Sequence, residues 1–126
     1  MLRIYPVVLE FIRGLRTTIA IIERKDRDLG RQLRRASASV ALNLAEGMYS
    51  RGRSRSAKYH VALGSARETL ACLEVAEAFG YIRPLAPLVR ARGPRRGNAG
   101  AARRTQSMTA LQPRLARLSN EGYREN

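Results

Sequence analysis

Apolar residues recur every three or four positions along the first two thirds of the chain, which is the spacing of one face of an α-helix. In the first segment this pattern predicts a helix from about Pro6 to Arg24, because proline is tolerated in a first helical turn. The charged stretch ERKDRD at residues 23–28 then interrupts the pattern. The apolar stripe of this helix consists of Ile4, Val8, Phe11, Leu15, Ile19 and Ile22.

A second helix follows the charged stretch directly. Either Asp26 or Asp28 can begin it, because aspartate accepts hydrogen bonds from the first free N–H groups of a helix. We expect the helix to end at Gly47, a residue suited to the position just after a helix. Its main stripe consists of Leu29, Leu33, Ala36, Val40 and Leu44.

A third helix follows the loop MYSRGRSRS at residues 48–56. We expect Ser54 or Ser56 to cap its start and Gly80 to close it. Helices of about 18 to 25 residues joined by short loops favour antiparallel neighbours, so the predicted fold is an all-α, up-down four-helix bundle. The stripe of the third helix consists of Tyr59, Leu63, Ala66, Leu70 and Leu73.

The charge and composition of the chain change after Ile82. Residues 1–82 hold 14 Lys and Arg against 8 Asp and Glu, whereas residues 83–126 hold 10 against 2 and are rich in Pro and Gly. We therefore expect a three-helix core over 1–82 and a C-terminal segment over 83–126. This segment is either a broken fourth helix carrying Leu111, Leu115 and Leu118, or a partly flexible tail, and the stretch at residues 92–104 has the composition of a flexible linker. Its composition is also that of an out-of-frame reading of a GC-rich gene, a hypothesis that a regular packed helix over 88–118 would contradict.

The second helix carries unusually small side chains over part of its length. From residue 36 to residue 45 nearly every side chain is small or apolar all the way round, which indicates burial on more than one side. One stripe can face the chain's own bundle, and we expect the other to face a second subunit. Ser37, Ser39 and Asn43 can hydrogen-bond across such a contact. The alternative is the central helix of one compact monomer. The predicted oligomer-interface residues are Ala38, Ala41, Asn43 and Ala45.

The net charge of +14 favours a polyanionic partner. Antiparallel pairing of the second and third helices predicts that Arg31, Arg34 and Arg35 lie near Glu68 and that Arg55 lies near Glu46, so ordinary salt bridges can use some of these charges. The basic loop after the second helix has essentially one local acid, Glu46, so it is the better nucleic-acid candidate. The predicted nucleic-acid-binding residues are Arg51, Arg53, Arg55 and Lys58 at this loop, with Arg31, Arg34 and Arg35 on the second helix.

The sequence contains few residues suited to catalysis or metal binding. His60 and Cys72 are the only histidine and cysteine, so we expect no catalytic site, no metal site and no cofactor. We interpret His60 as a surface or interface residue and Cys72 as a small buried filler. A single cysteine fits a reducing, cytoplasmic setting, and no apolar run is long enough to span a membrane.

Several motifs resemble one family of helical proteins. LRRASASVALNLAEG, the basic loop after it, and YHVALGSARETLACLEVAEAFGYI are similar to four-helix-bundle proteins first noted in intervening sequences of bacterial 23S ribosomal RNA genes. The accessory variability proteins of diversity-generating retroelements look like structural relatives. The resemblance covers residues 4–82, and its most specific parts lie at 34–47, 62–70 and 80–82.

The resemblance implies a four-helix bundle that assembles into a ring, typically a homopentamer, without catalytic activity. It also implies a basic surface that binds nucleic acid and a reverse transcriptase. It places Arg34, Arg35, Asn43, Glu46 and Gly47 in the signature helix. The chain departs from the family in two ways: Ala41 stands where the family often has proline, and the family's regular fourth helix is replaced by an Arg/Pro/Gly-rich segment.

Three functional hypotheses follow. The first is an oligomeric bundle that binds RNA, cDNA or other single-stranded nucleic acid, as an accessory of a reverse transcriptase. The second is a structural or protein-interaction ring with no role in nucleic-acid binding. The third, which the sequence favours least, is a basic amphipathic chain at a membrane surface, using Arg3, Arg13 and Arg16. Salt-sensitive binding to generic RNA separates the first from the second.

Overall fold

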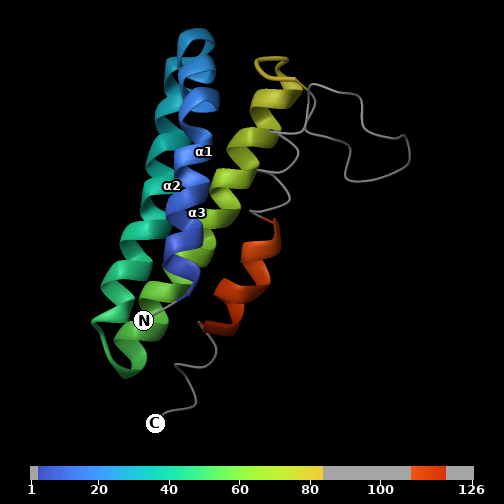
Figure 1. Cartoon of the computed structure of the whole chain (residues 1–126). Coiled ribbons are helices and arrows are strands. Elements are labelled where there is room, and N and C mark those ends of the chain that lie inside the picture. The colour runs from blue at the N-terminus through green and yellow to red at the C-terminus, as the bar shows by residue number, and fades with distance from the viewer. Residues whose placement is uncertain (1–2, 84–108, 119–126) are drawn as a thin grey trace, which may run out of the picture.

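The computed structural model describes residues 3–83 and 109–118, and all regular structure within these two ranges is helical. Three long helices follow one another: α1 (Ile4–Lys25), α2 (Arg27–Met48) and α3 (Gly52–Ala78). Each runs antiparallel to the one before it, and a shorter helix over residues 109–118 lies alongside them (Figure 1). The predicted all-helical, up-down arrangement is therefore observed within a single chain.

One hydrophobic core receives side chains from all four helices. The predicted α1 stripe is buried in full, and the α2 and α3 stripes are buried except for Leu29 and Leu70, which are half-buried. Each fully buried Leu or Ile stabilises the fold by roughly 1.5–3 kcal/mol, whereas an exposed ion pair contributes about 0–1 kcal/mol. The core, and not the surface charge, holds the helices together.

A single residue, Asp26, joins α1 to α2. Its extended backbone breaks the helix, and its Oδ1 accepts a hydrogen bond of 3.0 Å from the backbone N–H of Leu29. Of the two predicted N-caps, Asp26 is therefore the one used, and Asp28 lies inside the first turn, where a negative charge interacts favourably with the helix dipole.

The α2–α3 connection differs from the prediction at both of its ends. Gly47 is not a residue beyond the helix: α2 continues to Met48, and Gly47 is buried against the ring of Tyr59. The glycine is needed there because a Cβ would lie 2.5 Å from Tyr59 Cε1. Ser54 and Ser56 are not caps either, because α3 already begins at Gly52, whose φ of 55° is one that side chains strongly disfavour.

The end of α3 is closed as predicted. Gly80 has a φ of 74°, and the N–H groups of Gly80 and Tyr81 donate to the carbonyls of Glu77 and Ala76, which is the Schellman arrangement. The chain then returns to the start of α2. The Tyr81 hydroxyl donates to Asp26 Oδ2 at 3.2 Å, and Lys25 Nζ donates to the Tyr81 carbonyl at 2.9 Å.

The segment of α2 with mostly small side chains, residues 36–45, packs against a helix of the same chain. α2 packs more extensively against α3 than against α1. Small residues are also frequent among the buried positions of α3, so the two backbones approach closely. Ser39 Oγ and Ser65 Oγ are 2.7 Å apart across this contact, and Asn43 Nδ2 donates to Ser39. The small buried residues of α3 are Ser56, Ala62, Ser65, Ala66, Thr69, Cys72 and Ala76.

The C-terminal segment contains a packed helix. Leu111 and Leu115 are buried in the common core and Leu118 packs against it, so the predicted helical spacing of these leucines is observed over residues 109–118. The predicted linker at 92–104 lies outside the described residues. Most of the range 88–118 also lies outside the described residues. The out-of-frame origin of this segment, which a regular packed helix over that whole range would contradict, therefore stays a hypothesis. Within the described part of the chain, no helix is long and apolar enough to cross a membrane.

Two helical glycines provide a matched pair of variants. Gly47→Ala is expected to lower the free energy of unfolding by about 1–3 kcal/mol, because its Cβ would press on the buried Tyr59 ring. Gly64→Ala is expected to raise it by about 0.5–1 kcal/mol, because nothing lies within 4 Å of the new Cβ and alanine favours the helix. Urea unfolding monitored by circular dichroism measures both. Equal effects of the two substitutions would contradict the tight α2–α3 contact.

The link between Asp26 and Tyr81 gives a second prediction. Asp26→Ala is expected to lower the free energy of unfolding by about 1–2 kcal/mol, because it removes both the helix cap and the acceptor for Tyr81. Tyr81→Phe is expected to cost less, and to cost nothing further once Asp26 has been replaced. A double-mutant cycle measures this coupling, and strict additivity would show that the hydroxyl contributes independently of Asp26.

The same pair predicts a dependence on pH. Burial, the negative charge of Asp26 and the hydrogen bond between them raise the pKa of the Tyr81 hydroxyl above its ordinary value of 10.0. The stabilisation is therefore fully present below pH 10 and is lost as the pH rises through the higher pKa of the folded protein. Tyr81→Phe should remove this part of the alkaline loss of stability.

Candidate nucleic-acid interface

The loop between α2 and α3 is held rigidly by its own hydrogen bonds. The Ser50 hydroxyl donates to the Glu46 carbonyl at 2.9 Å, and the Ser50 N–H donates to the Gly47 carbonyl at 3.1 Å. From the first turn of α3, Arg55 Nε donates to the Ser50 carbonyl at 2.9 Å. The loop is therefore tied to the last turn of α2 and to the first turn of α3.

The basic residues of this loop fall into two groups. Arg51 and Arg53 are exposed and form no ion pair or side-chain hydrogen bond with the described part of the chain. Arg55 is half-buried and binds the loop, while Lys58 Nζ forms an ion pair of 2.5 Å with Glu46 Oε2. The local acid is thus already paired, and the charges of Arg51 and Arg53 remain uncompensated.

We define the loop surface as Tyr49, Arg51, Arg53 and Arg55. Tyr49 is the C-cap residue of α2 and its side chain is 88% exposed. Tyr59, the other aromatic residue near the loop, is only 3% exposed, and burial raises the pKa of its hydroxyl although the nearby Arg55 lowers it in part. Tyr59 is therefore a core residue, and Tyr49 is the accessible aromatic ring of the loop surface.

The predicted pairing of Arg55 with Glu46 is wrong, because Lys58 takes that acid. Arg55 lies in the first turn of α3, where its guanidinium reaches back to the loop carbonyl. Lys58 lies one turn further along, beside the last turn of α2. The antiparallel pairing correctly predicts that the start of α3 lies beside the end of α2. It does not determine whether Arg55 or Lys58 reaches the carboxylate of Glu46.

The predicted basic residues of α2 lie far from the loop surface. Arg35 is roughly 20 Å along α2 from Met48, at about 1.5 Å per residue. Arg31 and Arg35 are exposed, but Arg34 pairs with Glu23 of α1 through two nitrogens at 2.9 and 3.0 Å. Glu68, the predicted partner of these arginines, accepts a hydrogen bond of 3.3 Å from Gln32 instead. The seven predicted binding residues therefore do not form one patch.

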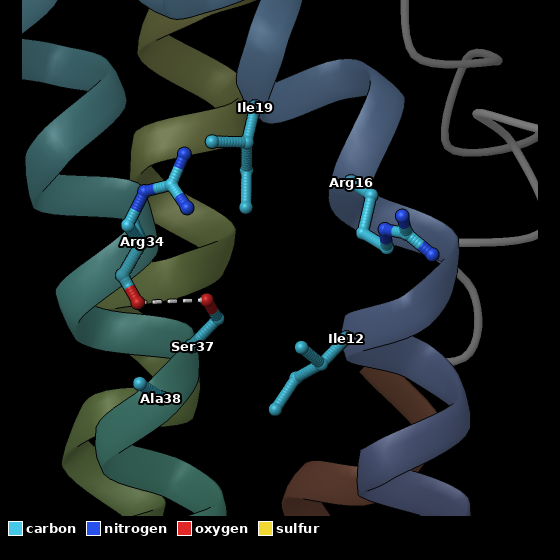
Figure 2. A pocket seen from close by; sticks show the side chains of 6 residues that line it. All are labelled: Ile12, Arg16, Ile19, Arg34, Ser37 and Ala38. Carbon is cyan, nitrogen blue, oxygen red and sulfur yellow. Dashed lines mark hydrogen bonds between the residues drawn. The ribbon is translucent and has the colours of Figure 1, made fainter.

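Arg34 also lines a groove of about 310 Å³ between α1 and α2. Figure 2 shows its guanidinium beside Ile19, whereas the side chain of Arg16 points away from α2. Ser37 donates to the Arg34 carbonyl of its own helix at 3.1 Å, so it does not bond across a helix contact as the sequence predicts. The groove is mainly apolar, and of the two cations that line it Arg34 is neutralised by Glu23 while Arg16 points away from α2. Its lining residues are Ile12, Arg16, Ile19, Arg34, Ser37 and Ala38.

The predicted interface residues of α2 lie in different environments. Ala41 is buried in the chain's own core, so its burial needs no second copy. Ala38, Asn43 and Ala45 are half-buried. Leu42 lies between them and is 62% exposed. It is absent from the predicted interface residues because that prediction considers only small side chains. The helix therefore does carry a second, partly exposed apolar strip beside its buried one.

One further cation belongs to the end of the bundle that carries the loop surface. Arg3 is exposed and lies at the N-terminus of α1. Because α1 runs antiparallel to α2, its start lies at the same end as the α2–α3 loop (Figure 1). The up-down topology predicted from the sequence already implies that Arg3 lies at the same end as the loop. The sequence analysis nevertheless names Arg3 only as part of a membrane-binding surface.

The histidine and the cysteine of the chain lie in different environments. His60 is exposed, and within residues 3–83 and 109–118 no three His, Cys, Asp or Glu side chains lie close enough to hold a metal ion. Cys72 is buried, and burial together with the nearby charge of Glu68 raises the pKa of its thiol. The reactive thiolate form of Cys72 is therefore disfavoured.

Comparison with known proteins relates these features to a family. The sequence model of the 23S rRNA-intervening sequence proteins matches residues 10–86, which include α2, α3 and the loop surface. No curated protein and no solved structure matches the chain. Because the match spans more than half of the sequence, the chain belongs to the 23S rRNA-intervening sequence protein family.

Proposed function

We propose that this chain is a non-enzymatic helical-bundle protein that binds RNA or single-stranded nucleic acid through the loop surface. The observation that carries the proposal is the pair of exposed arginines, Arg51 and Arg53, beside an acid that Lys58 already neutralises. Positive charge without a local counterion attracts phosphate. The family description names an intervening sequence of 23S rRNA, so RNA is the first polyanion to test.

Binding of this kind is directed at the nucleic-acid backbone. Arginine guanidinium groups form paired hydrogen bonds with phosphate oxygens, and each contact releases condensed counterions from the strand. We therefore expect salt-sensitive affinity with little dependence on base sequence.

The proposal includes assembly into a ring of identical subunits, a homopentamer by resemblance to the family. Its support in this chain is the outer strip of α2, where exposed Leu42 lies between the half-buried Ala38 and Ala45. An exposed leucine among small residues is a surface that a second helix can cover closely. In a ring, several copies of the loop surface would act on one strand and strengthen binding through multivalency.

An accessory role beside a reverse transcriptase is the most specific function that we propose. It rests on the structural likeness between this family and the accessory variability proteins of diversity-generating retroelements. Such a role would use the same loop surface, since the partner enzyme and this chain would hold the same template or cDNA.

Replacing Arg51 and Arg53 together by alanine tests the loop surface. For single-stranded RNA, the slope of log affinity against log salt is expected to fall in magnitude by about 1.4, because each phosphate that an arginine neutralises contributes about 0.7 to the slope. Fluorescence anisotropy with a labelled oligonucleotide at several salt concentrations measures this slope.

The matched control is Arg24→Ala with Arg27→Ala, which removes the same charge from the opposite end of the bundle, where both side chains are exposed. The control should leave most of the slope intact. If the unmodified protein fails to bind RNA at low salt, the nucleic-acid role is wrong and a purely structural or protein-interaction ring becomes the better interpretation.

Leu42→Asp tests the assembly. A charge in the outer strip of α2 is expected to lower the native mass, because an unpaired carboxylate is costly to bury between subunits. Light scattering after size-exclusion chromatography measures the mass. Val61→Asp is the control, since Val61 is 49% exposed but lies on α3. Loss of assembly in the control alone would place the subunit contact on α3 and not on α2.

A further inference from the structure

The ring of Tyr49 has no partner within residues 3–83 and 109–118. It is 88% exposed, and the side chain makes no hydrogen bond or ring contact with the described part of the chain. Exposing a large aromatic surface to water is unfavourable, and buried or paired aromatic rings are the common case. Folding of the chain therefore does not account for an aromatic residue at this position.

The backbone that carries Tyr49 is fixed. The Tyr49 N–H donates to the Glu46 carbonyl, and the next residue, Ser50, is held from three sides by Glu46, Gly47 and Arg55. A ligand that met this ring would therefore not have to order the loop first. Preorganisation of this kind lowers the entropic cost of binding.

The charges around Tyr49 select the class of ligand. Arg51 and Arg53 follow it at alternate positions and are exposed, so a flat ring and two uncompensated cations occupy the same short loop. Unpaired nucleotides offer the matching pair of features: a base with a free π-face and a phosphate beside it. A duplex hides its base faces in the stack and can offer only its phosphates to this loop.

The other exposed aromatic ring in the described part of the chain lacks these neighbours. Phe79 is 66% exposed, but it stacks on Tyr81 with ring centroids 5.4 Å apart and an angle of 19° between the rings. It follows the acidic residues Glu74 and Glu77 at the end of α3. Phe79 therefore has an aromatic partner within the chain, which Tyr49 lacks among the described residues.

We propose that Tyr49 stacks on an unpaired nucleobase and makes the loop surface prefer single-stranded over double-stranded nucleic acid. This inference rests on the proposed function, because Arg51 and Arg53 supply the phosphate contacts beside the ring. It adds a residue that determines specificity to a surface that would otherwise bind any phosphate backbone.

Direct binding measurements test the preference. The probes are a single-stranded oligouridine of roughly 16 nucleotides, the upper site size of a single-strand-binding module, and an RNA duplex of equal length. Tyr49→Ala is expected to weaken binding of the single strand by about 5- to 100-fold and to leave duplex binding unchanged within about twofold. Tyr49→Phe should retain the single-strand affinity because it keeps the ring, and Phe79→Ala should retain it because that ring lies elsewhere.

A spectroscopic test reports on the contact itself. The chain contains no tryptophan, so Tyr49→Trp introduces a single reporter at the position of interest. Stacking predicts that saturating oligouridine quenches the indole fluorescence and that the saturating duplex does not. Equal quenching by both probes would overturn the inference.

The outcomes separate this inference from the function on which it rests. If the unmodified protein binds neither probe, both proposals fail. If it binds both probes and Tyr49→Ala changes neither affinity, the loop surface binds nucleic acid but Tyr49 does not stack, and only the inference is lost. If Tyr49→Ala lowers the native mass, the ring belongs to a contact between copies of the chain, and the inference is again wrong.

Discussion

The close approach of α2 and α3 is the constraint on which the rest of the structure depends. Gly47 leaves space for the Tyr59 ring, and the hydroxyls of Ser39 and Ser65 meet at 2.7 Å. Bulkier side chains at these positions would force the two helices apart. The approach fixes the end of α2 and the start of α3, and so it fixes the short loop that joins them. The position of the loop surface is thus a consequence of packing in the core.

This contact explains why helix positions are predictable from the sequence and some helix ends are not. The apolar stripes of α1, α2 and α3 follow from a periodicity that every residue in the stripe reinforces. The role of Gly47 is different, because a glycine near the end of a helix is ambiguous from sequence. It can supply a left-handed backbone, as Gly80 does, or it can make room for a neighbour. Only the packed structure, with Tyr59 against Gly47, separates the two roles.

The candidate site is predictable in location and not in detail. A run of arginines with one local acid correctly identifies the loop as a segment in which exposed cations outnumber acids. Which cation pairs with Glu46 depends on side-chain reach within one helical turn, and sequence spacing does not resolve that. The arginines of α2 look equivalent to those of the loop, yet Arg34 is neutralised by Glu23 of α1. That pairing depends on tertiary geometry between two different helices.

The link between Asp26 and Tyr81 has a consequence for how the chain can vary. It ties the point where the polypeptide leaves α3 to the junction between α1 and α2, two places that are 55 residues apart in sequence. Whatever follows Arg83 therefore departs from a stationary anchor and not from a fraying helix end. A change in length beyond this anchor therefore leaves the register of the first three helices intact, provided that Leu111 and Leu115 still reach the common core.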